Sequence, residues 1–311
     1  MSDKMATRDA YGKVLVKLGE EFPELVVLDA DLSGSTKTKD FAKVYPERFF
    51  NMGIAEQNLF GTAAGLAVSG KTVCASTFAM FAAGRAFEII RNSIGYTHAN
   101  VKICATHSGI TVGEDGASHQ TFEDIALMRT IPGMIVINPS DGVSTMKLME
   151  QAVQLKGPCY VRLGRSAVPI NYLETDEIVI GKANTLREGN DATIVATGIM
   201  VYDALQAADQ LLQEGVAVRV IDMHTIKPLD ERTLLAAAKE TKHIVTAEEH
   251  SVIGGLGGAV AEFLAFNCPT HMAFVGQHDT FGESGKPDQL KEKYGMTADD
   301  IVKAVKHLIN K

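Results

Sequence analysis

Residues 50–58 read Phe50-Asn51-Met52-Gly53-Ile54-Ala55-Glu56-Gln57-Asn58, and they lead from a strand into a helix. Phe49 and Phe50 are typical of a strand, Gly53 permits a turn, and a helix rich in small residues is predicted over residues 55–68. Glu56 therefore falls in the first turn of that helix, beside apolar residues. The helix N-terminus stabilises its charged form by a few tenths to about 1 kcal/mol, whereas burial favours the neutral acid. Glu56 is then either a partner of the helix dipole or a functional acid.

Apolar strands alternate with helices on both sides of this stretch. Parallel strands that are buried on both faces read as continuous apolar runs, so the pattern indicates a doubly wound parallel sheet in an α/β domain spanning residues 1–170. The expected strands are 25–28, 72–76, 101–106, 134–138 and 160–163, and the expected helices start at Thr7 and span 81–96, 122–129 and 143–155.

The same alternation starts again after a polar, proline-containing stretch at residues 169–177. We therefore expect a linker over residues 171–185 and a second, smaller α/β domain over residues 186–311. The glycine-rich segment 254–258 lies between a strand and a helix, but Val260 occupies the third glycine position of a dinucleotide-binding motif. A structural turn is the better interpretation of that segment.

Composition restricts the function classes. The chain of 311 residues has a formal charge of −8, which speaks against binding to nucleic acids or anionic membranes. An anionic substrate would need a local basic clamp. The four cysteines are far apart and form no C-x-x-C pair, and no apolar run reaches the roughly 18 residues of a membrane span. These features predict a soluble cytoplasmic protein with reduced thiols.

One loop concentrates residues that carry chemistry. It follows the strand at 101–106 and reads His107-Ser108-Gly109-Ile110-Thr111-Val112-Gly113-Glu114-Asp115-Gly116-Ala117-Ser118-His119-Gln120. Two histidines, two acids and three glycines favour a functional loop over simple packing. A zinc site built from His107, Asp115 and His119 is disfavoured, because the spacing gives neither H-E-x-x-H nor a cysteine pair. The loop also lacks the Lys-Ser or Lys-Thr pair of a P-loop.

These motifs together resemble the transketolase family of thiamine-diphosphate enzymes. The resemblance rests on segments 52–57, 76–78 with Phe81, 106–120 and 162–165, in the family's order, and on segment 248–257 in the second domain. It covers the whole chain but only about half of a typical transketolase, because the N-terminal diphosphate-binding domain is missing. The resemblance implies a pyrimidine-binding domain followed by a transketolase C-terminal domain, as in the C-terminal subunit of a split transketolase.

The resemblance also implies the residues that hold the cofactor, thiamine diphosphate. Glu56 corresponds to the acid that hydrogen-bonds to the pyrimidine nitrogen N1′, and Phe78 and Phe81 correspond to aromatic residues on the pyrimidine face. Asp31 and Leu32 correspond to residues beside the thiazolium ring. Gly84 replaces a third aromatic residue, so the stacking pocket is expected to be less complete. Segment 113–116 with Asn138 imitates the family's metal motif, but it belongs to the substrate loop, so no metal ligand is expected here.

The substrate residues follow in the same way. The resemblance assigns a phosphate clamp for a sugar phosphate to four residues and contacts with the sugar hydroxyls to two others. Guanidinium groups and hydroxyls suit phosphate oxygens. His119 is also expected to transfer protons. The clamp comprises Arg8, Ser35, His107 and Arg165, and the hydroxyl contacts are Asp115 and His119.

The predicted reaction is transfer of a two-carbon ketol unit from a ketose phosphate to an aldose phosphate. It requires an N-terminal subunit that binds the diphosphate and most of the Mg²⁺ or Ca²⁺, which predicts a heterotetramer with two copies of each chain. Three alternatives stay open: a 1-deoxyxylulose-5-phosphate synthase, a 2-oxo acid dehydrogenase β subunit and a non-catalytic binding or regulatory subunit. Gln120 disfavours the synthase, which usually has a histidine there, and the 113–116 loop disfavours the dehydrogenase subunit.

Overall fold

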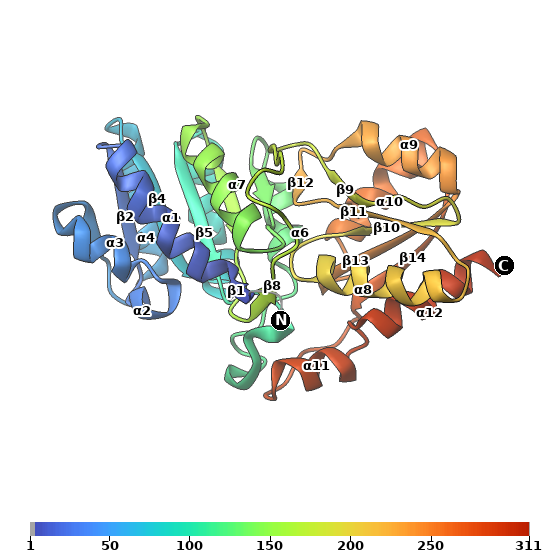
Figure 1. The fold of residues 1–311 in the computed structure, drawn as a ribbon. Helices are drawn as coiled ribbons and strands as arrows, with labels where there is room; N and C mark the ends of the chain where they lie inside the picture. The colour runs from blue at the N-terminus through green and yellow to red at the C-terminus, as the bar shows by residue number, and fades with distance from the viewer. Residues whose placement is uncertain (1–3, 311) are drawn as a thin grey trace.

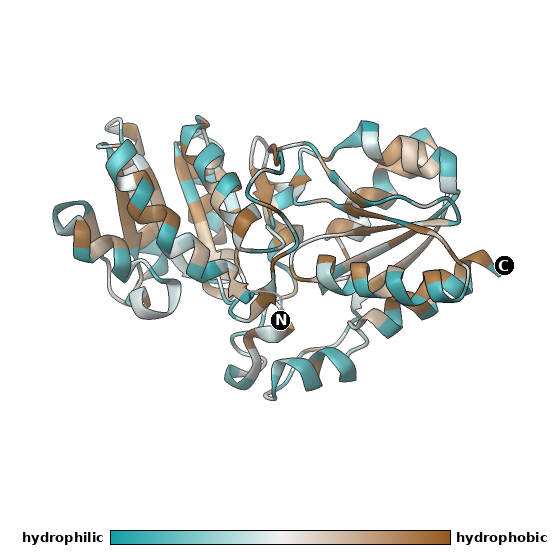
Figure 2. Cartoon of the chain, in the orientation of Figure 1, coloured by the Kyte–Doolittle hydropathy of each residue, from teal (hydrophilic) through white to brown (hydrophobic). Residues whose placement is uncertain are grey.

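The computed structural model describes residues 4–310 as two α/β domains that lie side by side (Figure 1). The N-terminal half, coloured blue to green, forms one domain, and the C-terminal half, coloured yellow to red, forms most of the other. In both, the strands are largely apolar and the outward faces of the helices are polar (Figure 2). This distribution is the one expected when helices cover buried sheets.

The sheet of the first domain is parallel apart from one edge strand. Among residues 4–310 it contains seven strands in the order β12-β6-β7-β5-β4-β2-β3. The edge strand β12 comes from the second half of the chain and pairs antiparallel with β6, so it joins the two domains. The strands are β2 (Leu25–Asp29), β3 (Phe49–Asn51), β4 (Thr72–Phe78), β5 (Val101–Thr106), β6 (Ile135–Ile137), β7 (Cys159–Arg162) and β12 (Thr225–Lys227).

Helices cover both faces of this sheet, which confirms the doubly wound architecture. Alternate residues of β2 show it: Val26 and Leu28 pack in one apolar core with α4, whereas Leu25 and Val27 pack in another with α1. The helical segments are α1 (Thr7–Glu21), α2 (Ser33–Thr36), α3 (Lys39–Val44), η1 (Pro46–Arg48), α4 (Glu56–Val68), η2 (Phe81–Arg85), α5 (Phe87–Ile89), η3 (Ile90–Gly95), η4 (Ile110–Asp115), α6 (Asp124–Thr130) and α7 (Gly142–Gln154).

The helix predicted over residues 81–96 is less regular than the sequence indicates. It consists of two π-helical turns, η2 and η3, on either side of the short α5. The amide of Ala86 bonds to the carbonyl of Phe81 at 3.3 Å, and that of Tyr96 bonds to Arg91 at 2.9 Å. Such bonds span five residues and accommodate one more residue per turn than an α-helix. They rotate the side chains that follow Phe81 relative to a regular helix.

The second domain has a smaller sheet, with five strands in the described chain in the order β14-β13-β10-β11-β9. Only β9 is antiparallel to its neighbour, and its first residues, Asn184 and Thr185, lie within the predicted linker. The short strands β1 (Lys4–Ala6) and β8 (Ala167–Pro169) pair separately. The other elements are β9 (Asn184–Arg187), β10 (Ala192–Ala196), α8 (Met200–Gln213), β11 (Val218–Asp222), α9 (Glu231–Thr241), β13 (His243–Ser251), α10 (Leu256–Asn267), β14 (His271–Gln277), α11 (Pro287–Lys293) and α12 (Ala298–Ile309).

The carboxyl ends of β2, β4, β5 and β7 meet at one edge of the first sheet, which is where ligands bind in open parallel sheets. Segments α2 and η4, which follow β2 and β5, lie at this edge, and α11 of the second domain packs against η4 (Figure 1).

Candidate active site

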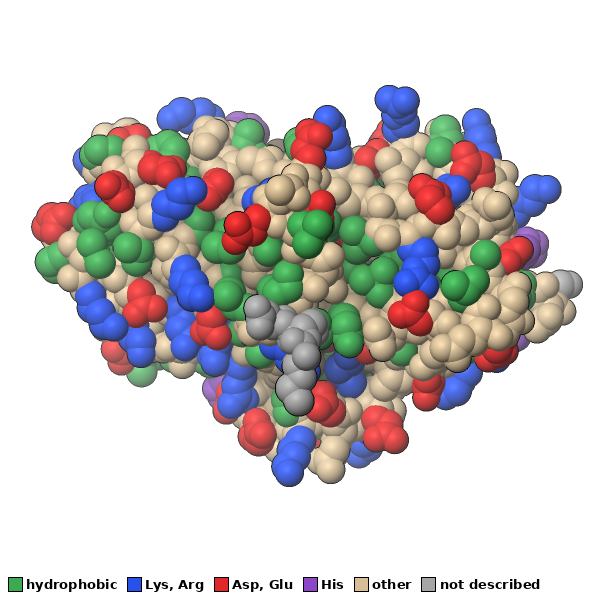
Figure 3. Space-filling model, viewed as in Figure 1, with side chains coloured by type: hydrophobic (Ala, Val, Ile, Leu, Met, Phe, Trp, Pro, Cys, Tyr) green, Lys and Arg blue, Asp and Glu red, His purple; other side chains and the backbone are tan. Residues whose placement is uncertain are grey.

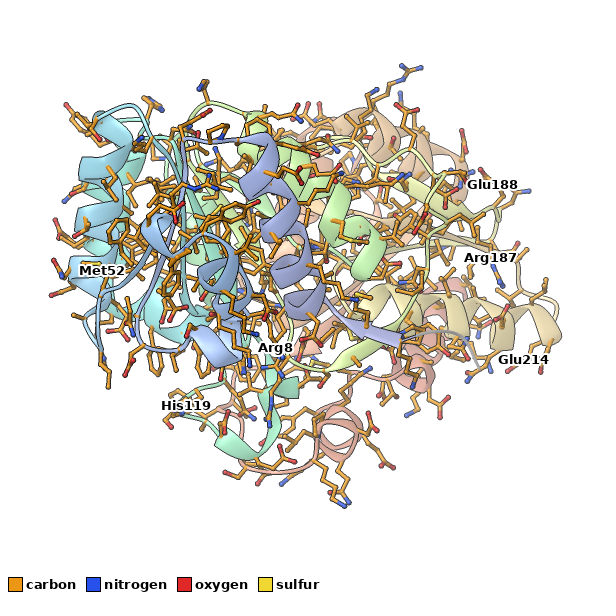
Figure 4. The ribbon with its side chains drawn as sticks, turned by 60° about the vertical axis from the view of Figure 1, so that its left-hand side comes forward. Arg8, Met52, His119, Arg187, Glu188 and Glu214 are labelled. Carbon is orange, nitrogen blue, oxygen red and sulfur yellow. The ribbon has the colours of Figure 1, made fainter. Side chains whose placement is uncertain are left out.

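A basic cluster forms where the first turn of α1 meets the loop after β5. Arg8 reaches from α1 to the Nε2 atom of His107 at 2.9 Å and to the backbone carbonyl of Ser35 at 3.2 Å. Three of the four predicted clamp residues therefore lie together, although Ser35 contacts Arg8 through its carbonyl oxygen. Figure 4 shows Arg8 and His119 on the same side of the molecule.

His107 is held in one protonation state. Burial and, to a lesser extent, the positive charges of Arg8 and Arg165 together lower the pKa of His107 to about 3. The ring is therefore neutral near pH 7. Because a guanidinium group can only donate, Nε2 accepts from Arg8, and Nδ1 carries the proton that it donates to the Thr106 hydroxyl at 2.9 Å. The ring is left with no donor toward the clamp.

Arg165 completes the cluster from the segment after β7. Its guanidinium donates to the backbone carbonyl of Val112 and lies 3.2 Å from the Glu114 carboxylate and 3.9 Å from that of Asp115. Burial lowers the pKa of Arg8, and Arg165 adds to that effect. The Nε atom of Arg8 is buried and has no hydrogen-bond partner among residues 4–310. Two neighbouring guanidinium groups, one of which has an N–H without a partner in the described chain, suit an anionic ligand.

An aromatic wall runs from the clamp toward Glu56. Phe78 ends β4 and Phe81 begins η2, and their rings stack with centroids 5.9 Å apart. Phe78 also stacks on His107 at 3.8 Å, while His119 meets the edge of Phe81 at 5.4 Å. The wall thus connects residues of the predicted cofactor and substrate sets. Asp115 is exposed at the rim of the same loop.

Glu56 lies at the other end of the aromatic wall, as the first residue of α4. Its side chain is only 2% exposed, and its carboxylate lies 3.3 Å from the guanidinium of Arg85. Arg85 also lies over the Phe81 ring, 5.5 Å from its centroid. Sequence reasoning missed Arg85, although it directly follows Gly84, the position that lacks the expected aromatic residue. The guanidinium therefore links the Glu56 carboxylate to the Phe81 ring.

The loop after β2 is tied to the turn that precedes Glu56. Asp31 accepts from the Asn51 side chain at 2.9 Å and donates its own amide to that side chain at 3.0 Å. The side-chain oxygen of Asn51, Oδ1, also accepts from the backbone amide of Gly53 at 3.0 Å. The amide of Leu32 bonds to the buried Asp29 carboxylate at 2.6 Å. Asn51 and Asp29 were missed by the sequence analysis, and the only signal was an acid that ends an apolar strand.

This arrangement brings a buried acid, an aromatic surface and a basic anion clamp into one row. An acid beside stacked rings can hold a flat heteroaromatic group, and the clamp can hold an anion beyond it. His119 lies between the two and can exchange protons with a ligand that spans them. A cavity of about 470 Å³ lies elsewhere, beside Phe122 and Phe281, and none of the predicted site residues line it.

The face of the molecule shown in Figure 3 does not present a broad basic patch. Figure 3 shows Lys and Arg side chains interspersed with Asp and Glu over the face in view. In the described chain, no helix combines the length and the apolar character that crossing a membrane requires.

Comparison with known protein families decides the identity of both domains. The pyrimidine-binding domain of transketolase matches residues 3–171, and the C-terminal domain of transketolase matches residues 181–301. The chain belongs to the transketolase family. It is 52% identical over 301 residues to a transketolase C-terminal section from Methanocaldococcus jannaschii, covering 96% of this chain and 94% of that protein.

Two further relatives have nearly the same length. A 6-deoxy-6-sulfo-D-fructose transketolase subunit from Clostridium sp. is 44% identical over 96% of this chain and 92% of its own. A solved structure described as a split gene transketolase, an inactive β4 tetramer, is 57% identical with a TM-score of 0.93 and covers 98% of this chain and 99% of its own. These matches confirm three predictions: the transketolase family, the likeness to the C-terminal section of a split transketolase, and the fold class.

Proposed function

We propose that this transketolase-family chain is the C-terminal half of an enzyme that moves a two-carbon ketol unit from xylulose 5-phosphate or a similar ketose phosphate to an aldose phosphate such as ribose 5-phosphate. The observation that supports it is the row that runs from Glu56 along Phe78 and Phe81 to the Arg8–His107 pair. An acid, an aromatic face and an anion clamp in this order suit a thiamine cofactor beside a sugar phosphate.

The residues present fit the pyrimidine end of thiamine diphosphate. The buried Glu56 carboxyl would hold a proton toward ring nitrogen N1′, and Phe78 and Phe81 would pack on the ring face. Asp31 and Leu32, whose loop Asn51 ties to the turn before Glu56, would border the thiazolium ring. When bound, thiamine diphosphate supplies the carbanion chemistry of the transfer.

The substrate would extend from the aromatic wall toward the clamp. Arg8 and Arg165 would bind the phosphate, and neutral His107 would orient Arg8 by accepting its N–H. His119 would move a proton at a sugar hydroxyl, and Asp115 would hydrogen-bond to a neighbouring hydroxyl at the rim. Ser35 would offer its hydroxyl to the phosphate while its carbonyl holds Arg8.

The diphosphate and its Mg²⁺ or Ca²⁺ would be bound mainly by an N-terminal subunit. The family match covers the pyrimidine-binding and C-terminal domains, and the relatives of similar length carry names that denote subunits or sections. We therefore propose an obligate hetero-oligomer, with two copies of each chain and a cofactor shared between them. The proposed division of this chain is residues 1–170 and 186–311, with a linker at 171–185.

Replacement of Glu56 by Gln tests this proposal. A carboxamide keeps the size of the side chain but cannot supply the acidic proton at N1′, so ketol transfer by the assembled enzyme should fall at least a hundredfold. The matched control is Gln57→Glu, because Gln57 is the exposed neighbour on the same helix turn. Wild-type turnover in Glu56→Gln would rule out the proposed role.

A second substrate class has one observation in its favour. The 44% identical Clostridium relative is named for a sulfonated ketose, and a clamp of guanidinium groups accepts a sulfonate as readily as a phosphate. Transfer from 6-deoxy-6-sulfo-D-fructose with no transfer from xylulose 5-phosphate would favour the sulfonate.

A further inference from the structure

The substrate loop at residues 107–120 belongs to the first domain, but its backbone is held by the second. The amide of Thr111 donates to the Oε1 atom of Glu249, in β13, at 2.6 Å. Thr111 and Glu249 are each only 2% exposed, so water does not replace this bond. Gly109, at φ 76°, passes so close that a Cβ atom there would overlap the Glu249 carboxyl group. The loop is therefore fitted around this single side chain.

Glu249 is itself fixed from the opposite side. Its backbone carbonyl accepts from the Nη2 atom of Arg162 at 2.9 Å, and the Nε atom of Arg162 pairs with the buried Asp124 carboxylate at 2.8 Å. Tyr160 donates to the same Asp124 oxygen at 2.7 Å. Burial raises the pKa of the Glu249 carboxyl, while Arg162 and the Thr111 amide oppose that rise. In either protonation state, an oxygen of Glu249 can accept from Thr111.

The far end of the loop is also anchored on the second domain. The side-chain amide of Gln120 donates to the backbone carbonyl of Glu283 at 2.9 Å and to the carbonyls of Ile110 and Gly113 at 3.3 Å each. A Cβ atom on Gly116 would overlap the Ser284 hydroxyl. Between these anchors the loop carries Asp115 and His119, so a shift of either anchor would displace them.

We propose that Glu249, from the C-terminal domain, is a positioning residue for the sugar substrate, because its bond to the Thr111 amide fixes the loop that carries His107, Asp115 and His119. This proposal rests on the proposed function of those residues. It gives the second domain a role in substrate binding, although Glu249 itself does not touch the substrate.

The neighbouring acid provides a matched control. Glu248 is as buried as Glu249, but its carboxylate accepts from the amides of Leu256 at 2.7 Å and Gly257 at 2.8 Å, at the start of α10. Its hydrogen bonds therefore stay within the second domain. A Cβ atom on Gly255 would overlap it, which explains the glycine-rich turn as packing around an acid.

Two substitutions separate reach from charge. Glu249→Asp keeps the charge beside Arg162 but is one methylene too short to reach Thr111, whereas Glu249→Gln keeps the reach and loses the charge. In the enzyme assembled with its N-terminal subunit, positioning predicts that Glu249→Asp raises the KM for the ketose phosphate at least tenfold and that Glu249→Gln stays within threefold of wild type. The affinity for thiamine diphosphate should change less than twofold in both, because the Glu56 carboxylate lies on α4 and pairs with Arg85 rather than with the loop.

Hydrogen exchange supplies a readout that does not depend on catalysis. In this chain alone, exchange over residues 107–120 should accelerate at least tenfold in Glu249→Asp and stay near wild type in Glu249→Gln and in the control Glu248→Asp. An unchanged KM and unchanged exchange in Glu249→Asp would overturn the proposal, as would equal effects of the Asp and Gln variants. If the wild-type assembly transfers no ketol unit, the proposed function fails, while the exchange result still decides whether Glu249 fixes the loop.

Discussion

Replacement of Arg162 by Met should strongly destabilise the first domain, and it also removes one hydrogen bond to the second domain. The Nε atom of Arg162 lies 2.8 Å from Asp124, and the two side chains are 2% and 0% exposed. Two unit charges about 4 Å apart attract by about 4 kcal/mol at the effective dielectric constant of about 20 that suits protein sites. Burial would raise the pKa of Asp124, yet Arg162, followed by His250, holds it below its ordinary value.

The loss expected for Arg162→Met is about 3–5 kcal/mol in the free energy of unfolding, because it leaves a buried carboxylate without its counter-charge. The Oδ1 atom of Asp124 already has no hydrogen-bond partner among residues 4–310, and Tyr160 alone would remain on Oδ2. The carbonyl of Glu249 would lose its Arg162 donor as well.

Urea unfolding followed by circular dichroism measures this loss. The double variant Asp124→Leu with Arg162→Met removes both charges, so it should lose less stability than Arg162→Met alone. A loss below about 1 kcal/mol in Arg162→Met, or a double variant that loses the sum of the two single losses, would refute the reasoning.

Three further predictions concern titration and the cofactor site. Burial raises the pKa of Asp222 to about 7, opposed by hydroxyl bonds from Ser140 and Tyr172 at 2.8 Å each. This value exceeds the pKa of about 4 in the unfolded chain, so the stability that Asp222 contributes is complete below pH 4 and is lost as the pH rises toward 7. Asp222→Asn should therefore make the melting temperature less dependent on pH between about 4 and 7. Because the pKa of His107 is lowered to about 3, its ring signals in NMR spectra should stay constant between pH 5 and 8. Phosphate binding at the clamp should raise that pKa. A titration midpoint of His107 near pH 6.5 without ligand would contradict the buried, neutral ring. Arg85→Met removes a partly exposed ion pair with Glu56 that is worth about 0–1 kcal/mol. Thiamine diphosphate should then bind the assembled enzyme up to about fivefold more tightly in a circular dichroism titration. Weaker binding would mean that Arg85 assists cofactor binding.

Sequence reasoning succeeded where a local pattern carries the information. Continuous apolar runs predict the parallel strands, and β4 and β5 are indeed buried along their whole length. The motifs around Glu56 and His107 are contiguous in sequence, so the family could be identified from them. The start of α4 at Glu56 differs from the expected helix by a single residue.

What the sequence could not reveal depends on contacts between distant residues. Thr111 and Glu249 are 138 positions apart, and no periodic pattern links an amide to an acid over that distance. Strand β12 joins the first sheet although it follows the second domain's first strands, because a short edge strand carries little signal of its own partner. The π-helical turns after Phe78 escaped notice since apolar spacing alone does not distinguish them from an α-helix.

The most direct test of the account is ketol transfer from xylulose 5-phosphate to ribose 5-phosphate, with thiamine diphosphate and Mg²⁺ present. The purified chain would be assayed alone and together with the proposed N-terminal subunit, sought by co-purification from the native cells. We expect turnover only when both subunits are present. Turnover by this chain alone would contradict a cofactor site shared between subunits. Absence of turnover by the assembled, cofactor-loaded pair of subunits would contradict the proposed reaction.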